Sequence, residues 1–357
     1  MPDIAKDPVF LVGASALPYW LSPRPKSLDT TFEQELASCG QDPSSIIPFL
    51  GSTMAFPPLH AVPDNLRTAL SAGQSHVICS SIGGWPPVHV LSSGSVPRTS
   101  TQSYQRSVLP RRIPKHCYVK VSERIFVPRP ELALLQSAAI LDLVELTVLC
   151  SLFFSVFCFR GDSSRLVPRR ALCSKESVRA FLDSCTGSGL APAGADLLKR
   201  AVRLAVEQTA SPAELSCGLR MELPISLDGY GFAGARHNAC VSTGDSPDDV
   251  RWCDWLWKTR DGRLVAVEYE SDQEHQGDAR RKRDRKRDNE LIAANITPIS
   301  LLSEHFASTA AMDVAARQIG KTLGRRPFPD DDDSRAGRER LRRKIASMLN
   351  RLRGLVA

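Results

Sequence analysis

One stretch of the chain combines the pattern of a β-hairpin with more acid than a hairpin normally carries. The segment WCDWLWKTRDGRLVAVEYESDQEH, residues 252–275, has alternating apolar side chains on both sides of the turn signal RDGR at 260–263. Acidic side chains are poor strand formers, and a buried carboxylate is costly unless a positive charge meets it. Asp254, Glu268 and Glu270 nevertheless lie within the two strands. Their presence requires a physical reason.

The length of the turn decides which acids face each other. A two-residue turn would place Asp254 opposite Tyr269, whereas a three-residue loop with a left-handed Gly262 places Asp254 opposite Glu268 on one face. Two facing carboxylates repel each other. A divalent cation between them removes the repulsion, and oxygen ligands favour Mg²⁺ or Mn²⁺. We therefore predict the three-residue loop and a metal site at Asp254 and Glu268.

The positive charge of the chain is concentrated in two segments. The formal net charge is +7, but residues 279–288 hold seven Lys and Arg against two Asp, and residues 335–353 hold eight against one Glu. Such segments make a polyanion, and nucleic acid first, the partner to test. A solvated helix face and a solvated tail are the alternative interpretations of these segments.

The cysteines and the apolar segments exclude other classes of protein. The ten Cys are scattered without any C-x-x-C spacing, so a structural zinc site has no support, and we expect most of them to be buried thiols in a reducing compartment. Residues 146–159 are apolar, but a membrane span needs about 20 residues, so a buried core helix is expected there. Asp3 and Asp7 give the N-terminus the wrong charge for a signal peptide. We expect a cytoplasmic protein without a membrane partner.

The pattern along the chain predicts two domains and a tail. Residues 1–190 mix short strands with a helical run that starts near Pro130, which indicates an α+β domain. In residues 194–325 the expected order is helix, hairpin, a basic helix, the strand 296–302 and a final helix near 307–323. Residues 326–357 form an acidic linker and a basic amphipathic tail. Its apolar stripe, within 341–352, is predicted to dock on the body or on a protein partner.

A second motif precedes the hairpin. The sequence SPAELSCGLRMEL provides Ser211 as a helix N-cap, Pro212 at the first helical position and Glu214 completing S-x-x-E. The capping box alone is enough to explain Glu214.

Together these residues resemble the nuclease core of the PD-(D/E)xK superfamily, most closely the branch similar to very-short-patch-repair endonucleases. The resemblance covers about residues 195–305 and rests on Asp254, the Glu268-Tyr269-Glu270 strand end, His275 and the KRDRKRDNEL helix. It implies a restriction-endonuclease-like mixed sheet flanked by helices. The usual Lys is replaced by Glu270, and the Gly that normally follows is Ser271. The N-terminal half more loosely resembles abortive-infection type IV antitoxin-like regulators, through GASALPYW and VPRPELALLQSA.

The resemblance implies a role for each residue. Asp254 and Glu268 would hold Mg²⁺ or Mn²⁺, with the Tyr269 carbonyl as a further ligand, and Glu270 or His275 would orient or deprotonate the attacking water. Glu214 would orient a metal-bound water. The phosphate-binding residues would be Arg280, Arg283 and Arg287, with Arg287 contacting the reacting phosphate.

Each role has a simpler alternative. His275 is also compatible with an ordinary surface position, and Asp284 and Asp288 with ion pairs along the basic helix. Trp252, Trp255 and Trp257 are interpreted as core and edge packing rather than as base-stacking platforms.

Two functions follow, with a third kept open. The first is a metal-dependent DNA endonuclease in defence or mobile-element biology. The second is a DNA-binding regulator or antitoxin-like protein on a nuclease scaffold that no longer cleaves. The third is a scaffold that binds a protein partner through the 341–352 stripe, for which salt-dependent DNA affinity is not expected.

Overall fold

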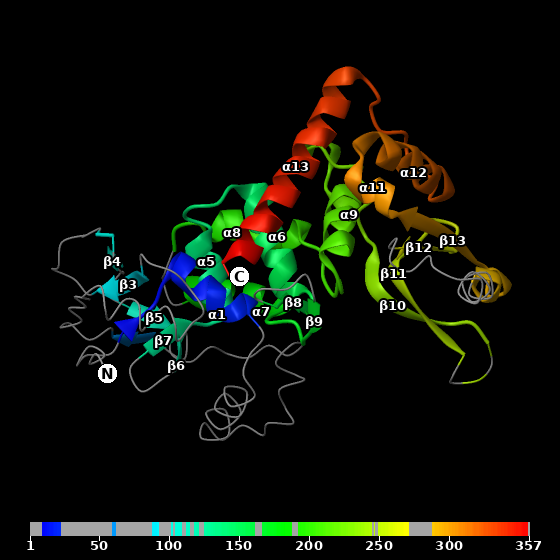
Figure 1. The fold of residues 1–357 in the computed structure, drawn as a ribbon. Coiled ribbons are helices and arrows are strands. Elements are labelled where there is room, and N and C mark those ends of the chain that lie inside the picture. Colours follow the sequence, from blue (N-terminus) through cyan, green and yellow to red (C-terminus); the bar gives the residue numbers. More distant parts are fainter. Residues whose placement is uncertain are drawn as a thin grey trace. The chain divides into compact units, whose positions relative to one another are not determined.

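The computed structural model divides the chain into two compact units (Figure 1). The first comprises residues 1–203 and 350–357, and the second comprises residues 204–349. Both units contain helices and strands, so the chain is a mixed α/β protein. The structure describes residues 9–22, 59–61, 88–92, 101–102, 104–108, 112–114, 118–120, 125–160, 166–187, 192–244, 246, 249–270 and 288–355.

Short strands precede the helices in the first unit. Its largest described sheet has three strands in the order β1-β7-β6, with β1 parallel and β6 antiparallel to β7. The other described strands pair two by two, β2 with β5, β3 with β4 and β8 with β9. The elements are β1 (Val9–Phe10), η1 (Gly13–Ala16), α1 (Leu17–Leu21), β2 (Leu59–Ala61), β3 (Val88–Ser92), β4 (Tyr104–Val108), β5 (Arg112–Pro114), β6 (Tyr118–Lys120), β7 (Ile125–Pro128), α5 (Pro130–Ser137), α6 (Leu143–Phe154), β8 (Phe157–Phe159), β9 (Leu166–Pro168), α7 (Lys175–Gly187) and α8 (Ala195–Leu204).

The helical run that starts at Pro130 forms two helices rather than one. Pro130 occupies the first position of α5, as predicted, and Asp142 then starts α6 with a capping box to Glu145. The buried core helix predicted at 146–159 is confirmed as far as Phe154, because every residue of α6 from Leu146 to Phe154 is buried, but residues 157–159 form strand β8. Within the described part of the chain, no helix has the length and apolar character needed to cross a membrane.

The second unit is built on a mixed four-stranded sheet. Its order is β10-β11-β12-β13, with β11 antiparallel to both neighbours and β13 parallel to β12. The expected helix, hairpin, strand and final helix are present in this order, but strand β10, which precedes the hairpin, was not predicted, and residues 271–287 lie outside the description. The elements are α9 (Pro212–Glu222), η3 (Ile225–Leu227), β10 (Arg236–Ser242), β11 (Val250–Lys258), β12 (Leu264–Glu270), β13 (Ile296–Leu302), α11 (Ser303–Ala307), α12 (Thr309–Thr322) and α13 (Asp332–Gly354), with residues 288–293 also helical.

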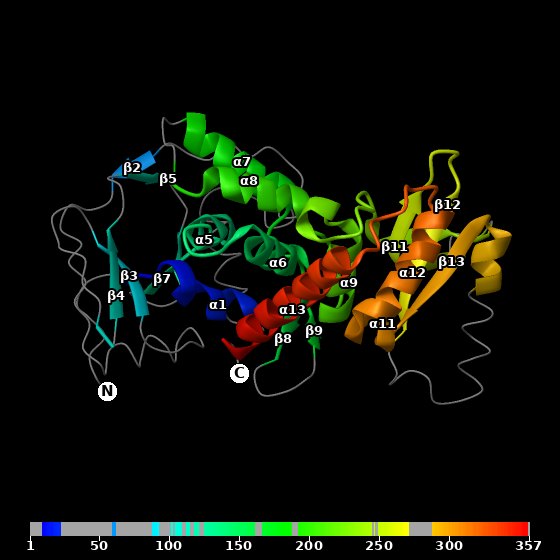
Figure 2. The same ribbon diagram turned by 90° about the horizontal axis from the view of Figure 1, so that it is seen from above.

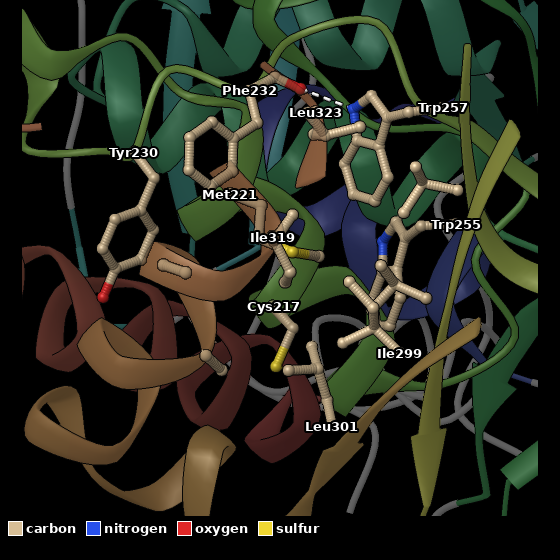
Figure 3. Packing of buried hydrophobic residues seen from close by; sticks show 14 of the residues in the cluster. Cys217, Met221, Tyr230, Phe232, Trp255, Trp257, Ile299, Leu301, Ile319 and Leu323 are labelled. Carbon is tan, nitrogen blue, oxygen red and sulfur yellow. Dashed lines mark hydrogen bonds between the residues drawn. The ribbon is translucent and has the colours of Figure 1, made fainter. Parts of the chain in front are cut away.

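Both faces of this sheet are packed. On one face, α9 and α12 cover Trp255 and Trp257, whose indole rings are almost fully buried (Figures 2 and 3). The Trp257 Nε1–H donates a 2.7 Å hydrogen bond to the carbonyl oxygen of Phe232, which satisfies its polar atom inside the core. On the other face, Leu291 from the helical residues 288–293 packs in a smaller cluster that includes Ala266. The sheet is therefore held rigidly between two layers.

The basic tail is a single helix, α13, and its apolar stripe is buried. Arg338 on this helix makes a bidentate ion pair with Asp313 of α12, and both side chains are almost inaccessible to solvent. The hydroxyl of Tyr230 donates a further 2.6 Å hydrogen bond to the same carboxylate. The structure thus places the stripe against the protein itself. Its buried residues are Leu341, Ile345, Met348, Leu349 and Leu352.

Candidate functional site

The turn of the acidic hairpin has the predicted three-residue loop. The N–H of Thr259 donates to the carbonyl oxygen of Arg263 at 2.8 Å, and the N–H of Gly262 donates to that of Thr259 at 3.0 Å. Gly262 has a φ of 88°, in the left-handed region that glycine adopts without strain. The strand pairs Trp255–Val267 and Lys258–Leu264 have the register that this loop imposes. The prediction for the loop is confirmed.

The hairpin strands separate at the position of the acids. Pairing between β11 and β12 ends at Trp255–Val267, but β11 remains paired with β10 as far as Val250, and β12 remains paired with β13 as far as Glu270. The sheet therefore forks beyond Trp255. We use the word fork below for this divergence of β11 (250–254) from β12 (268–270).

Asp254 and Glu268 lie at the start of the fork. The pairing of β11 with β12 ends one residue earlier, at Trp255–Val267, so the predicted pair of Asp254 with Glu268 is not formed in the ladder. Asp254 Oδ2 accepts a 2.6 Å hydrogen bond from the N–H of Tyr269, so its carboxylate is turned toward β12. The Glu268 Oε1 atom is buried. Asp254 thus contacts the backbone of β12 where the ladder has opened, and Glu268 follows Ala266 on the face of the smaller cluster.

Glu270 is held by a contact that the sequence did not predict. Its Oε1 atom accepts a 2.6 Å hydrogen bond from the hydroxyl of Ser300 on β13, the residue that lies opposite Glu268 in the parallel ladder. Ser300 therefore pairs with Glu268 along the strand ladder and contacts Glu270 through its side chain. Its only signal in the sequence is a hydroxyl side chain within an otherwise apolar strand.

Glu214 has two roles in the geometry. It begins α9 as predicted, because its N–H donates to Ser211 Oγ at 3.1 Å, and its carboxylate accepts from the N–H of Ala210 at 2.7 Å. The pKa of Glu214 is raised to about 7, first by burial and then by the negative charge of Asp254, against the lowering effect of these hydrogen bonds. Capping alone does not describe this residue, since its carboxylate also lies within electrostatic range of Asp254.

Four predicted site residues lie outside the described residues: His275, Arg280, Arg283 and Arg287. The described end of the predicted basic helix, residues 288–293, is helical. Glu290 within it accepts a 2.8 Å hydrogen bond from Arg251 Nε on β11. The chain therefore passes directly from the basic segment 279–288 into a helix that is fixed to the forked strand.

Asp254 and Glu268 supply the type of ligand that a small divalent cation uses. Magnesium is usually bound through one or two carboxylates while water and substrate phosphate fill its other positions. Asp254 and Glu268 provide two such carboxylates on neighbouring strands. In the described ranges, no group of three or more His, Cys, Asp or Glu side chains is placed to hold a metal ion.

No protein-family model, curated protein or solved structure matches this chain. The function is therefore inferred from the geometry of the second unit.

A further pair of polar residues was not anticipated. His237 Nε2 and Glu222 Oε1 are 2.6 Å apart, and the other oxygen of Glu222 accepts hydrogen bonds from the N–H groups of Gly234 and Ala235. The pair ties the end of α9 to the start of β10. Fifteen residues separate its members, so no local motif indicates it.

Proposed function

We propose that the second unit is a metal-dependent DNA endonuclease that hydrolyses phosphodiester bonds, with Mg²⁺ or Mn²⁺ as its cofactor. The feature that supports this most is the fork, where Asp254 of β11 and Glu268 of β12 are the first residues beyond the last hairpin pair. A mixed sheet with helices on both faces is also what the resemblance to PD-(D/E)xK nucleases implies. A role in defence or mobile-element biology belongs to the same proposal.

The acidic residues of the fork would bind the metal ion and activate the attacking water. A bound Mg²⁺ or Mn²⁺ acidifies a coordinated water and screens the charge that develops on the phosphate. Asp254 and Glu268 would hold the cation, and the Tyr269 carbonyl is a further donor beside them. Glu270, fixed by Ser300, would orient the water or accept its proton, as would His275.

The remaining residues would act on the substrate side. Arg280, Arg283 and Arg287 would bind phosphates, because guanidinium groups make paired hydrogen bonds to phosphate oxygens. Glu214 would hold a proton near neutral pH, since its pKa is about 7. It could therefore donate a hydrogen bond to a water between itself and Asp254.

The test is incubation of the full chain with plasmid and linear DNA in Mg²⁺, Mn²⁺ or EDTA. Asp254→Ala and Glu268→Ala should abolish metal-dependent cleavage and leave DNA affinity intact or raised, because each removes a ligand and a negative charge from a phosphate-binding surface. Arg287→Ala should lower affinity and rate together. Glu304→Ala, which removes an exposed acid of α11 outside the fork, is the matched control.

One observation favours the alternative, a DNA-binding regulator on a nuclease scaffold. Glu270 occupies the place of the usual catalytic Lys, and its carboxylate already accepts a hydrogen bond from Ser300. In that case the wild-type protein binds DNA with a steep salt dependence but cuts no substrate with either metal. Affinity that is unchanged between low and moderate salt would argue against a nucleic-acid partner in either case.

A further inference from the structure

The two buried tryptophans of the sheet differ in one respect. Trp255 and Trp257 belong to the same core cluster, as predicted, whereas 58% of the surface of Trp252 is exposed. The Trp257 Nε1–H donates to the carbonyl oxygen of Phe232 (Figure 3). In the described part of the chain, Trp255 Nε1, which is also buried, has no hydrogen-bond partner. A buried donor without a partner is costly, so this atom requires an explanation.

His237 lies beside Trp255 and carries a second buried atom of this kind. The two residues form a pair of the β10–β11 ladder, and the His237 side chain is only 5% exposed. Its Nε2 atom is 2.6 Å from Glu222, whose carboxylate also accepts two backbone N–H groups. Because a carboxylate only accepts, Nε2 carries the proton, and Nδ1 of the neutral imidazole is then an acceptor. Among the described residues, nothing donates a hydrogen bond to Nδ1.

Both rings approach the backbone of α9 at Gly218. A Cβ atom at this position would lie 2.9 Å from Trp255 Nε1 and 3.0 Å from His237 Cε1, the ring carbon bonded to Nδ1. Both distances are too short for ordinary van der Waals contact, so a side chain at position 218 would press on both rings. The donor of Trp255 and the acceptor side of His237 therefore converge on one point beside the helix.

We propose that Trp255, His237 and Gly218 form a binding site for one buried water molecule. The water accepts the hydrogen bond of Trp255 Nε1–H and donates one to His237 Nδ1, so one small ligand satisfies a donor and an acceptor together. Two hydrogen bonds of about 2.9 Å that meet at one oxygen span atoms this close to each other. Buried waters in proteins make roughly two to four hydrogen bonds to polar groups that otherwise have no partner.

The water joins three elements of the second unit. Trp255 belongs to β11, His237 to β10 and Gly218 to α9. Asp254 directly precedes Trp255 on its strand, and Glu214 begins the same helix as Gly218. The water therefore helps to hold α9 against the strand that carries Asp254. This inference goes beyond the proposed function, because the water site needs neither a metal ion nor DNA.

The test is observation of the water by NMR of the full chain, with ¹⁵N-labelled tryptophan. The indole N–H signals are assigned from the single variants Trp255→Phe and Trp257→Phe. In a rotating-frame experiment, the Trp255 N–H should show a cross-peak at the water frequency with the sign of a dipolar contact, which is opposite to that of proton exchange. Trp257 is the internal control, and its N–H should show no such cross-peak, because it donates to Phe232.

A glycine substitution tests the place of the water. Gly218→Ala should remove the Trp255 cross-peak, because the added Cβ enters the site at 2.9 Å from Nε1. Gly354→Ala is the matched control, since an added Cβ at this helical glycine has nothing within 4 Å, and it should keep the cross-peak. A cross-peak that persists in folded Gly218→Ala overturns the site.

Two results on the wild-type protein also overturn the proposal, whether or not Gly218→Ala folds. The first is a Trp255 N–H without a dipolar cross-peak to water. The second is a scalar coupling across a hydrogen bond from Trp255 Nε1–H to His237 Nδ1, because the two groups then bind each other directly.

Discussion

Glu214 should make the second unit less stable at neutral pH than at pH 5. Its pKa rises from 4.5 to about 7 in the folded protein, because of burial and then the charge of Asp254. Between these two values the folded state keeps a proton that the unfolded state has lost, so the free energy of unfolding falls as pH rises through this interval and is level above it. One pKa unit corresponds to about 1.4 kcal/mol, so the free energy of unfolding should decrease by roughly 3 kcal/mol in total.

Glu214→Gln should remove this pH dependence. Glutamine keeps an acceptor for the Ala210 N–H, so the helix start is preserved and only the charge is lost. In EDTA, the variant should match wild type near pH 4 and be more stable by up to roughly 3 kcal/mol at pH 8. Asp254→Asn should give a smaller effect of the same sign, because it removes the second cause of the raised pKa and leaves burial in place.

The measurement is urea unfolding of wild type and variants at several pH values, followed by tryptophan fluorescence. The difference between wild type and Glu214→Gln cancels all other titrating groups, which both proteins share. The carboxyl of Glu214 can also be titrated directly by ¹³C NMR, with the variant providing the assignment. A carboxyl that titrates near 4.5, or a difference in stability that does not vary with pH, would refute the buried, Asp254-coupled position of Glu214.

Three further outcomes follow from single contacts. Gly262→Ala should lower the free energy of unfolding by about 1–2 kcal/mol, measured by urea unfolding, because the loop holds Gly262 at a φ of 88°. Asp313→Ala should destabilise the protein by about 3–5 kcal/mol in the same assay, since it leaves the Arg338 guanidinium buried without its carboxylate. Ser300→Ala should shift the pH profile of DNA cleavage and leave DNA affinity unchanged. The reason is that, in the described part of the chain, the Ser300 hydroxyl donates its hydrogen bond to the carboxylate of Glu270. Ser300→Thr keeps a hydroxyl and should restore the profile.

The acidic hairpin could be predicted from the sequence because local rules control it. The turn residues select the loop length, and the loop length fixes the register, so the pairs from Trp255–Val267 to Lys258–Leu264 follow without knowledge of the remaining fold. The start of α9 is equally local, since Ser211, Pro212 and Glu214 are close in sequence. The strand Ile296–Leu302 was also predicted to the residue, because it is an apolar run bounded by polar segments.

The fork itself could not be predicted, because it depends on three strands at once. Whether β11 stays with β10 or with β12 beyond Trp255 is decided by the packing of both sheet faces, which no local pattern records. The same holds for Ser300, which reaches Glu270 only through the parallel pairing of β12 with β13, and for the exposure of Trp252. Strand pairing in the first unit is equally non-local, since β6 and β7 are separate strands that pair antiparallel.

The charge pattern also has a different meaning once the structure is known. Both basic segments predicted a polyanion, yet within 335–353 the charge is largely compensated inside the protein. Glu339 is ion-paired with both Arg342 and Arg343, and the hydrogen bonds from these two side chains hold the pKa of Glu339 far below its ordinary value. Ion pairs with acids of the protein also involve Arg335, Arg338, Arg340 and Arg351. A guanidinium that is already paired releases few counterions when phosphate approaches it. The affinity for nucleic acid, and its dependence on salt, should therefore be a property of residues 279–288.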